Sequence, residues 1–232
     1  NLKELDKKEL KRIEKNFLAF FEKYRNLYEY ESPLYYEDIV ATKIILDRNE
    51  DDFTPKKFVF EGKEKLVVDK TNKEHFKEIT LKYKNRCMQS IKLNKNRDIY
   101  LMPNSRIAIK GGMRMSDLFN PINFYILNQY FERFENDDSM IALMASVLHL
   151  CRLTDIKSQS QFPFWVPKNN IVERNILLLL KKRIERVLKD KNANTLKLNL
   201  VTDFKQLNKT KKSIYFLNKP SQTITEAEIP ND

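Results

Sequence analysis

The sequence predicts an α+β fold that is mostly helical, with a small antiparallel sheet in the N-terminal half and a helical hairpin plus a basic helix in the C-terminal half. Three observations lead to this prediction. Apolar residues make up 41% of the 232 residues, which is enough to bury a core. They recur with helical spacing in several long stretches. A stretch rich in β-branched residues separates the first of these from the others.

The first helix is predicted at the N-terminus. Asp6 and Glu9 have the spacing of a capping box. Apolar residues then recur every three or four positions from Leu10 to Tyr28, which corresponds to a helix of about six turns. We expect this helix to stop near residues 31–33, because a proline disfavours helical backbone at the residue before it.

The sheet is predicted in the segment that follows. Residues 39–46 are rich in β-branched side chains, and residues 58–60 and 66–68 form two short apolar runs. The five residues between these two runs include Gly62, one of the three glycines of the chain. We therefore expect the two runs to form a β-hairpin.

A short helix is predicted after the hairpin. Thr71 and Glu74 are spaced to cap it, and we expect it to continue through Tyr83. Residues 86–114 show no clear period, and we interpret them as loops with short strands.

Three further helices are predicted in the C-terminal half. Residues 120–121, an asparagine followed by a proline, are typical of an N-cap and the first helical position. The polar residues 136–138 end this helix and begin a second one over residues 140–152. Because the connection is short, we expect the two to pack as an antiparallel hairpin. A third helix is predicted over residues 171–189 and a strand over residues 213–217.

The positive charge is concentrated in one part of the chain. The net charge is +11, and residues 168–219 hold 14 Lys and Arg against 4 Asp and Glu. Compositional drift in a Lys-, Asn- and Ile-rich chain is the alternative explanation, but drift should scatter the charge more evenly. We therefore interpret residues 168–219 as a surface that faces a polyanion, most simply nucleic acid.

A polar loop is expected at residues 152–174, between the second and third helices. Its Gln, Asn and Ser side chains can bond to base edges or phosphates, its Lys and Arg supply charge, and aromatic rings can stack on a base. The alternative is that Phe162, Phe164 and Trp165 anchor a long loop to the core, because large aromatic side chains mostly pack. The candidate DNA-contacting residues of this loop and of the next helix are Arg152, Lys157, Gln159, Gln161, Trp165, Lys168, Asn169, Asn170, Arg174, Lys181, Lys182 and Arg186.

Other kinds of site have weak support. Three glycines give no phosphate-binding loop, and two cysteines with two histidines predict no metal site and fit a reducing, cytoplasmic location. No apolar run is long enough to cross a membrane.

An alternative function is a Mg²⁺-dependent nuclease built on Asp47 or Asp51 with Glu61 and Lys63, although Glu61 and Lys63 flank a glycine that is typical of a turn. A basic domain that binds RNA or a protein is a further alternative.

Four motifs in the second half resemble a known family. They are residues 117–127 (Asp117-Leu-Phe-Asn-Pro-Ile-Asn-Phe-Tyr-Ile-Leu), Ser146-Val-Leu-His149, Phe164-Trp-Val-Pro167 and Glu173-Arg-Asn175. In this order they resemble the segment that precedes the catalytic Asp-Pro-Pro-Tyr motif of adenine-type (amino-) site-specific DNA methyltransferases. The resemblance covers residues 116–232.

The resemblance implies a specific organisation. A helix follows Glu173-Arg-Asn175, and a strand at residues 213–217 and a turn at residues 229–232 then precede the catalytic strand. The catalytic motif and the S-adenosylmethionine loop are absent from this chain, so the resemblance gives no catalytic residue and no cofactor here, and S-adenosylmethionine belongs to the suspected parent enzyme. We expect residues 1–115 to be a mixed helix and β-hairpin insertion that acts in target recognition, and residues 116–232 to be a helical DNA-facing segment. The implied partners are double-stranded DNA and the remainder of a methyltransferase that belongs to a restriction-modification system. No membrane partner is implied. Whether this chain is itself an enzyme stays open.

Overall fold

The largest sheet is built mostly from strands of the N-terminal half of the chain, and most of the helices follow these strands, so the predicted α+β fold class is confirmed. The computed structural model describes residues 7–32, 37–47, 54–61, 65–98, 114–159, 162–167, 171–193, 198–201, 213–218 and 223–228. The contacts divide into two units, residues 1–184 and 185–232, and each is described by itself. The domain boundary predicted near residue 115 adjoins residues 99–113, which lie outside the description.

The first helix has the predicted apolar face but ends earlier than predicted. Helix α1 (Lys7–Tyr24) buries Phe17 and Phe20, and a 3-10 turn (Arg25–Tyr28) follows it. Residues 29–31 are strand β1 instead of helix. The reason is tertiary: Tyr30 is fully buried and pairs with Ile39 of the next strand, and this pairing outweighs the local helical period. Asp6, the predicted cap, lies outside the described residues.

Five strands form the sheet of the first unit. They are β1 (Glu29–Glu31), β2 (Asp38–Leu46), β3 (Pro55–Glu61), β4 (Lys65–Asp69) and β7 (Val172–Arg174). All pairings are antiparallel, and the predicted hairpin is confirmed as β3 and β4. Residues 43–45 of β2 pair with β3 on one edge and with β7 on the other, so β7 extends the sheet from a distant part of the chain.

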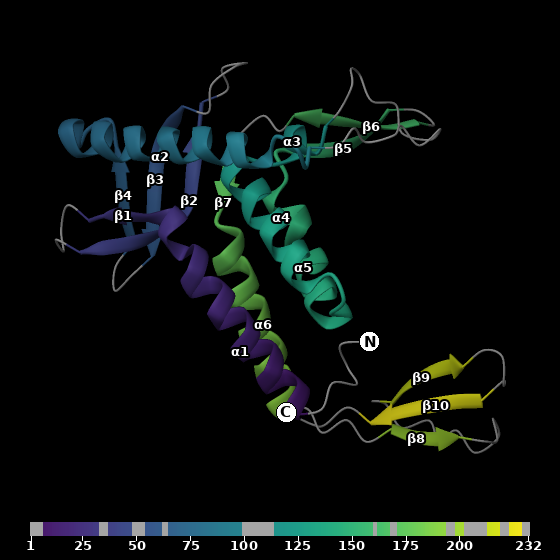
Figure 1. The fold of residues 1–232 in the computed structure, drawn as a ribbon. Coiled ribbons are helices and arrows are strands. Elements are labelled where there is room, and N and C mark those ends of the chain that lie inside the picture. The colour runs from purple at the N-terminus through teal and green to yellow at the C-terminus, as the bar shows by residue number, and fades with distance from the viewer. Residues whose placement is uncertain are drawn as a thin grey trace. The chain divides into compact units, whose positions relative to one another are not determined.

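Helix α2 (Lys73–Asn94) is much longer than the predicted short helix. Its buried positions continue past Tyr83 through Cys87, Ser90 and Asn94, whose small or polar side chains concealed the helical period. The interpretation of residues 86–94 as loops and strands is therefore wrong. In Figure 1 α2 crosses strands β2, β3 and β4, and its Tyr83 ring packs edge-on against Phe58 with 6.0 Å between ring centroids.

The predicted helical hairpin is present. It consists of α4 (Pro121–Phe134) and α5 (Asp138–Cys151), preceded by the short α3 (Met115–Leu118). Asn120 caps α4 by accepting a bond from the Ile122 amide at 3.0 Å, as the Asn-Pro pair predicts. Asp137 caps α5 by accepting from the Met140 amide at 3.2 Å.

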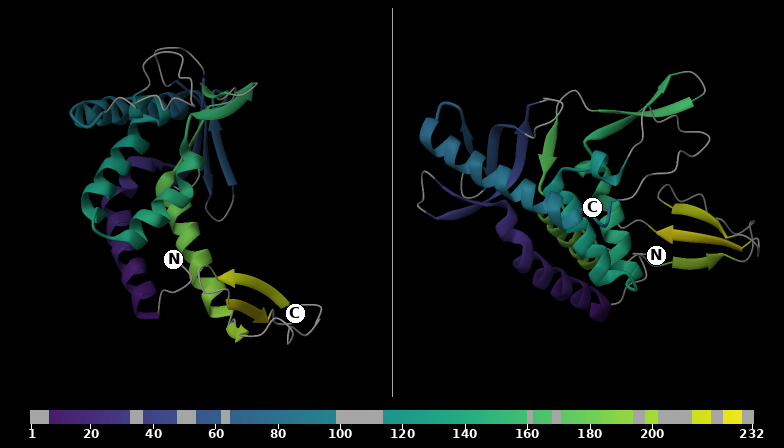
Figure 2. Two further views of the ribbon diagram at one scale, coloured as in Figure 1. Left: turned by 90° about the vertical axis from the view of Figure 1, so that its right-hand side faces the viewer. Right: turned by 45° about the horizontal axis from the view of Figure 1, so that its top comes forward.

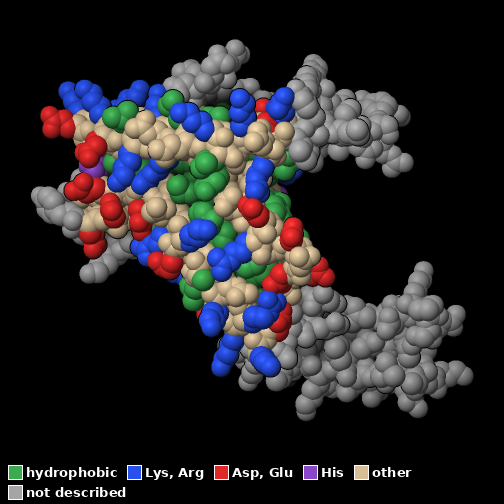
Figure 3. Space-filling model, in the orientation of Figure 1, with side chains coloured by type: hydrophobic (Ala, Val, Ile, Leu, Met, Phe, Trp, Pro, Cys, Tyr) green, Lys and Arg blue, Asp and Glu red, His purple; other side chains and the backbone are tan. Residues whose placement is uncertain are grey.

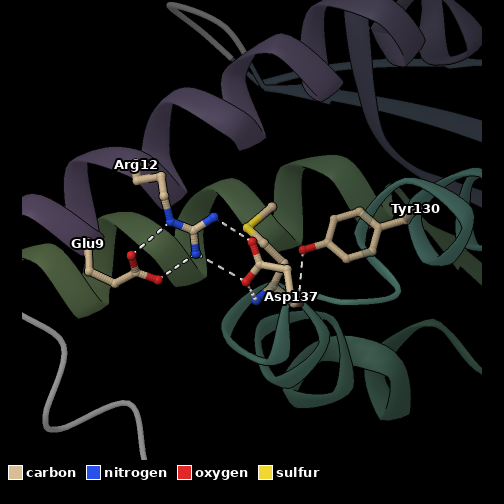
Figure 4. A network of polar contacts seen from close by, with 5 residues as sticks. Glu9, Arg12, Tyr130 and Asp137 are labelled. Carbon is tan, nitrogen blue, oxygen red and sulfur yellow. Dashed lines mark hydrogen bonds and ion pairs between the residues drawn. The ribbon is translucent and has the colours of Figure 1, made fainter.

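An ion-pair network links α1 to this hairpin. Arg12 lies between Glu9 of its own helix and Asp137, with 2.6 Å from Nη1 to the Asp137 carboxylate (Figure 4). The Arg12 bonds hold the pKa of Asp137 below its usual range. Beside it, the Tyr130 hydroxyl donates to the Met140 carbonyl at 2.9 Å. One end of the helical hairpin is therefore fixed to α1 by the Arg12–Asp137 ion pair, and the Tyr130 bond holds α4 and α5 together there.

The residues between α5 and the last helix form strands, so the predicted polar loop is wrong. Strands β5 (Thr154–Gln159) and β6 (Phe162–Pro167) form an antiparallel hairpin. The β-branched and aromatic residues of this segment have high β-propensity, which the loop interpretation overlooked. No other strand of the described residues joins this two-stranded ribbon.

Helix α6 (Ile176–Ala193) starts five residues later than predicted, because residues 172–174 pair with β2. Its residues 176–184, which belong to the first unit, lie beside α1 in both Figure 1 and Figure 2. None of the helices in the described parts of the chain is long and apolar enough to span a membrane.

The second unit contains a three-stranded antiparallel sheet. Its strands β8 (Leu198–Val201), β9 (Ser213–Asn218) and β10 (Thr223–Glu228) have the order β8-β10-β9. The strand predicted at residues 213–217 is confirmed as β9. No element was predicted at residues 223–228, yet they form β10, which pairs along the whole of β9; the turn predicted at residues 229–232 lies outside the described residues.

Candidate nucleic-acid interface

The segment Glu173-Arg-Asn175 connects the sheet to the basic helix α6, and each residue has a different environment. Glu173 is fully buried and Arg174 is exposed, as the alternation of a strand requires. Asn175 is buried and caps α6: its Oδ1 accepts from the Leu177 amide at 3.0 Å, and its Nδ2 donates to the Ala41 carbonyl at 2.9 Å. The sheet therefore fixes both the backbone of Arg174 and the start of α6.

Three cations of α6 share its exposed face. Lys182, Arg186 and Lys189 are exposed and lie three or four residues apart, so they form a row along the helix. The opposite face carries Ile176, Leu180 and other buried apolar residues. For Lys182 and Arg186 the predicted outer position is correct.

Lys181 does not belong to this row. It is half-buried, and its ammonium lies 5.6 Å from the centroid of the Phe21 ring of α1. A cation in this position interacts with the negative face of the ring and helps to hold α6 against α1. Arg152 is also half-buried, at the C-terminal end of α5. Both side chains are therefore partly covered by packing, which the sequence pattern did not reveal, and neither belongs to the exposed row of α6.

Three of the remaining predicted contacts, Lys157, Gln159 and Trp165, lie on the β5–β6 ribbon. Lys157 pairs with Phe164, Gln159 with Phe162, and Ile156 with Trp165. Because cross-strand partners share a face, positions 157 and 159 fall on one face of the ribbon and position 165 on the other. The other predicted residues, Gln161, Lys168, Asn169 and Asn170, lie outside the described residues.

A second basic surface lies on α2, and sequence reasoning missed it. Residues 73–94 contain six Lys and Arg against two Glu, but averaging over the whole N-terminal part concealed this excess. Its exposed lysines alternate with exposed apolar side chains (Figure 3), namely Leu81, Met88, Ile91 and Leu93. The sequence signal was available in the charge count of this single helix.

A buried polar cluster underlies the exposed Arg174. The Glu173 carboxyl contacts the hydroxyls of Tyr28 and of Tyr83, the latter at 2.5 Å. Tyr28 also contacts the Asn123 side-chain oxygen at 2.7 Å, and Asn120 donates to the Tyr83 hydroxyl at 2.6 Å. This cluster joins the turn after α1, helices α2 and α4, and strand β7.

Burial dominates the electrostatics of this cluster. It raises the pKa of Glu173 to about 7, against an ordinary value of 4.5, because a buried charge loses its hydration. The hydrogen-bonded contacts with Tyr28 and Tyr83 act on this pKa in the opposite direction. Burial likewise raises the pKa of the Tyr28 and Tyr83 hydroxyls well above 10, so both stay protonated.

The described residues offer few metal ligands for the site of a metal-dependent nuclease. They contain no group of three or more His, Cys, Asp or Glu that could hold a metal ion. Asp47, a proposed ligand, pairs with Lys56 at 2.7 Å. Asp51 and Lys63 lie outside the description, and Glu61 ends β3 opposite Lys65.

Comparisons with known proteins give no match: no protein family, curated protein or solved structure is detectably similar to this chain. Assignment of function therefore depends on the geometry and on the motifs described above.

Proposed function

We propose that this chain is the DNA-binding, target-recognition part of an S-adenosylmethionine-dependent DNA amino-methyltransferase and lacks the catalytic motifs itself. The parent enzyme would methylate an exocyclic amine of a base turned out of the duplex. The chain would contact the phosphate backbone and contribute part of the recognition of the target sequence.

The observation that supports this proposal most is the path from β7 into α6. Arg174 is exposed on a strand fixed by β2, and α6 continues from it with Lys182, Arg186 and Lys189 exposed in one row. Cations at such spacing on a rigid element can contact successive phosphates of DNA. The helix also begins directly after Glu173-Arg-Asn175, as the resemblance to the methyltransferases implies.

The ribbon β5–β6 supplies a second element of suitable shape. The major groove of DNA accepts a two-stranded β-ribbon, whose polar side chains can then bond to base edges. Lys157 and Gln159 fall on one face of this ribbon by register. We assign base reading to this face and phosphate contact to Arg174 and α6.

Duplex binding as a function of salt tests the phosphate contacts. We expect the full chain to bind duplex DNA, with an affinity that falls steeply between low and physiological salt. In the double variant Lys182→Gln, Arg186→Gln, the slope of log K against log salt should decrease by about 0.9 for each lost phosphate contact. The matched control is Lys65→Gln, Lys70→Gln, which removes two exposed lysines at the two ends of β4.

The outcomes separate the competing functions. No binding to any duplex at low salt, or equal slopes for the test and control variants, would refute the proposal. Equal affinity for unrelated duplexes and single strands would indicate a basic interaction domain without base reading. Mg²⁺-dependent nicking that disappears in Glu61→Ala would indicate the nuclease instead.

A further inference from the structure

The amide orientations in the cluster around Glu173 are fixed by the backbone. The Asn123 Nδ2 donates to the Arg174 carbonyl at 2.9 Å, so its Oδ1 is the atom that faces Tyr28. The Asn120 Oδ1 accepts from the Ile122 amide at 3.0 Å, so its Nδ2 faces Tyr83. Neither amide can rotate by 180° without losing a backbone bond.

These orientations determine where the tyrosine protons go. Tyr83 accepts a bond from Asn120, so its own hydrogen is available for the Glu173 Oε2 at 2.5 Å. Tyr28 lies between two oxygens, the Asn123 Oδ1 at 2.7 Å and the Glu173 Oε1. A hydroxyl has one hydrogen, so it can donate to only one of them.

A hydrogen on Glu173 satisfies all of these contacts. The Asn120 amide then donates to Tyr83, Tyr83 to the Glu173 Oε2, the protonated Oε1 to Tyr28, and Tyr28 to Asn123. With an ionised carboxylate, one of the two short contacts of Tyr28 has two oxygens and no hydrogen between them, which is unfavourable in a buried site.

We propose that Glu173 is a neutral carboxylic acid in the folded protein, donates its hydrogen to Tyr28, and acts as the positioning residue for Arg174 and the start of α6. Glu173 precedes Arg174 in β7, and the same chain of bonds continues through Asn123 to the Arg174 carbonyl. The part of this inference that concerns DNA depends on the proposed function; the protonation of Glu173 does not.

The other ionisable groups around the cluster do not supply a counter-charge. Tyr30 of β1, Cys87 of α2 and Cys151 of α5 interact electrostatically with the two tyrosines, and all three are buried. The Arg86 guanidinium lies over the Tyr30 ring at 4.8 Å and donates to two backbone carbonyls. Among the described residues, no lysine or arginine bonds to the Glu173 carboxyl.

Carbon-13 NMR of the full chain tests the protonation directly. With ¹³C-labelled glutamate, the signal of Glu173 is identified by its absence in Glu173→Gln. We expect its Cδ shift at pH 6 to be that of a protonated acid and to move to that of a carboxylate only as the pH passes about 7. A carboxylate shift at pH 6 would overturn the proposal.

The positioning role is tested by duplex affinity at pH 6 and pH 8. The amide introduced by Glu173→Gln has one donor group and one acceptor group, as the neutral acid has. From pH 6 to pH 8 the duplex affinity of the natural chain should therefore fall several-fold more than that of Glu173→Gln. The other titrating groups are the same in both proteins, so they cancel in this comparison. Equal pH dependence in the two would overturn the positioning role.

The two parts of the inference fail separately. If the natural chain binds no DNA at either pH, the proposed function is wrong, while the NMR titration still decides the protonation. Glu173→Ala serves as a second variant, in which both tyrosines lose their partner; affinity equal to that of Glu173→Gln would contradict positioning. If Glu173→Ala does not fold, the comparison with Glu173→Gln still decides.

Discussion

Raising the pH should destabilise this protein through Glu173. The pKa of this carboxyl is about 7 in the folded protein and 4.5 when it is exposed. Between these values the folded state keeps a proton that the unfolded state has lost. Stability therefore decreases as the pH rises, because the unfolding free energy falls wherever the unfolded state binds fewer protons. The contribution is fully present below pH 4.5 and is lost by about pH 7.

The magnitude follows from the two pKa values. Each unit of difference between the folded and unfolded pKa corresponds to about 1.4 kcal/mol. For Glu173 the decrease in stability is about 3 kcal/mol across the whole interval, a large share of the roughly 5–15 kcal/mol that is typical of a folded domain. In Glu173→Gln the amide keeps the hydrogen-bond pattern and cannot ionise, so this decrease should be absent.

Urea unfolding followed by far-ultraviolet circular dichroism at pH 5, 6, 7 and 8 measures the effect. The quantity of interest is the stability difference between Glu173→Gln and the natural chain at each pH, since all other titrating groups cancel in it. We expect the difference to grow in favour of Glu173→Gln as the pH rises to 7 and then to remain constant. A difference that is independent of pH, or a Glu173→Gln variant that is less stable at pH 8, would show that Glu173 is ionised in the folded protein and refute the reasoning.

Two further predictions concern the ends of helices. Asn175→Ala should reduce stability by about 1–2 kcal/mol in urea unfolding, because it removes the cap of α6 and the bond to the β2 backbone; an unchanged midpoint would contradict the capping role. Asp137→Ala should reduce the free energy of unfolding by about 1 kcal/mol or more, because it removes the cap of α5. Arg12→Ala should reduce it by less than about 1 kcal/mol, since the Arg12 side chain is 43% exposed and its ion pairs are screened by salt. Equal losses in the two variants at low salt that both disappear at 1 M salt would show that the ion pair, and not the cap, carries the effect.

Local signals in the sequence predicted the elements that local chemistry determines. Asn120 with the following proline, and the acidic residues at 137–138, gave the helical hairpin because capping depends on neighbouring backbone groups. The β3–β4 hairpin followed from two apolar runs and a turn of five residues. These features need no knowledge of the rest of the fold.

The features that sequence reasoning missed depend on distant contacts. Residues 29–31 and 172–174 continue helical patterns locally but form strands because β2 pairs with them. Ser90 and Asn94 lie on the buried face of α2 although their side chains are polar. Glu173 resembles any acidic residue in a basic segment, and its burial depends on Tyr28, which is 145 positions away in the sequence. No local window contains that information.

The pairing of β7 with β2 also has a consequence for the order in which the chain can fold during synthesis. Residues 43–45 leave the ribosome early, together with their partners in β3, but their second partner strand ends only at Arg174. Until then one edge of β2 remains open at these residues, and an open edge can pair with the strands of other nascent chains. A chain truncated before residue 172 would keep that edge permanently and would leave the hydroxyls of Tyr28 and Tyr83 without their carboxyl partner. Completion of the sheet therefore coincides with the synthesis of β7, the strand that directly precedes the basic helix α6 and its cap Asn175.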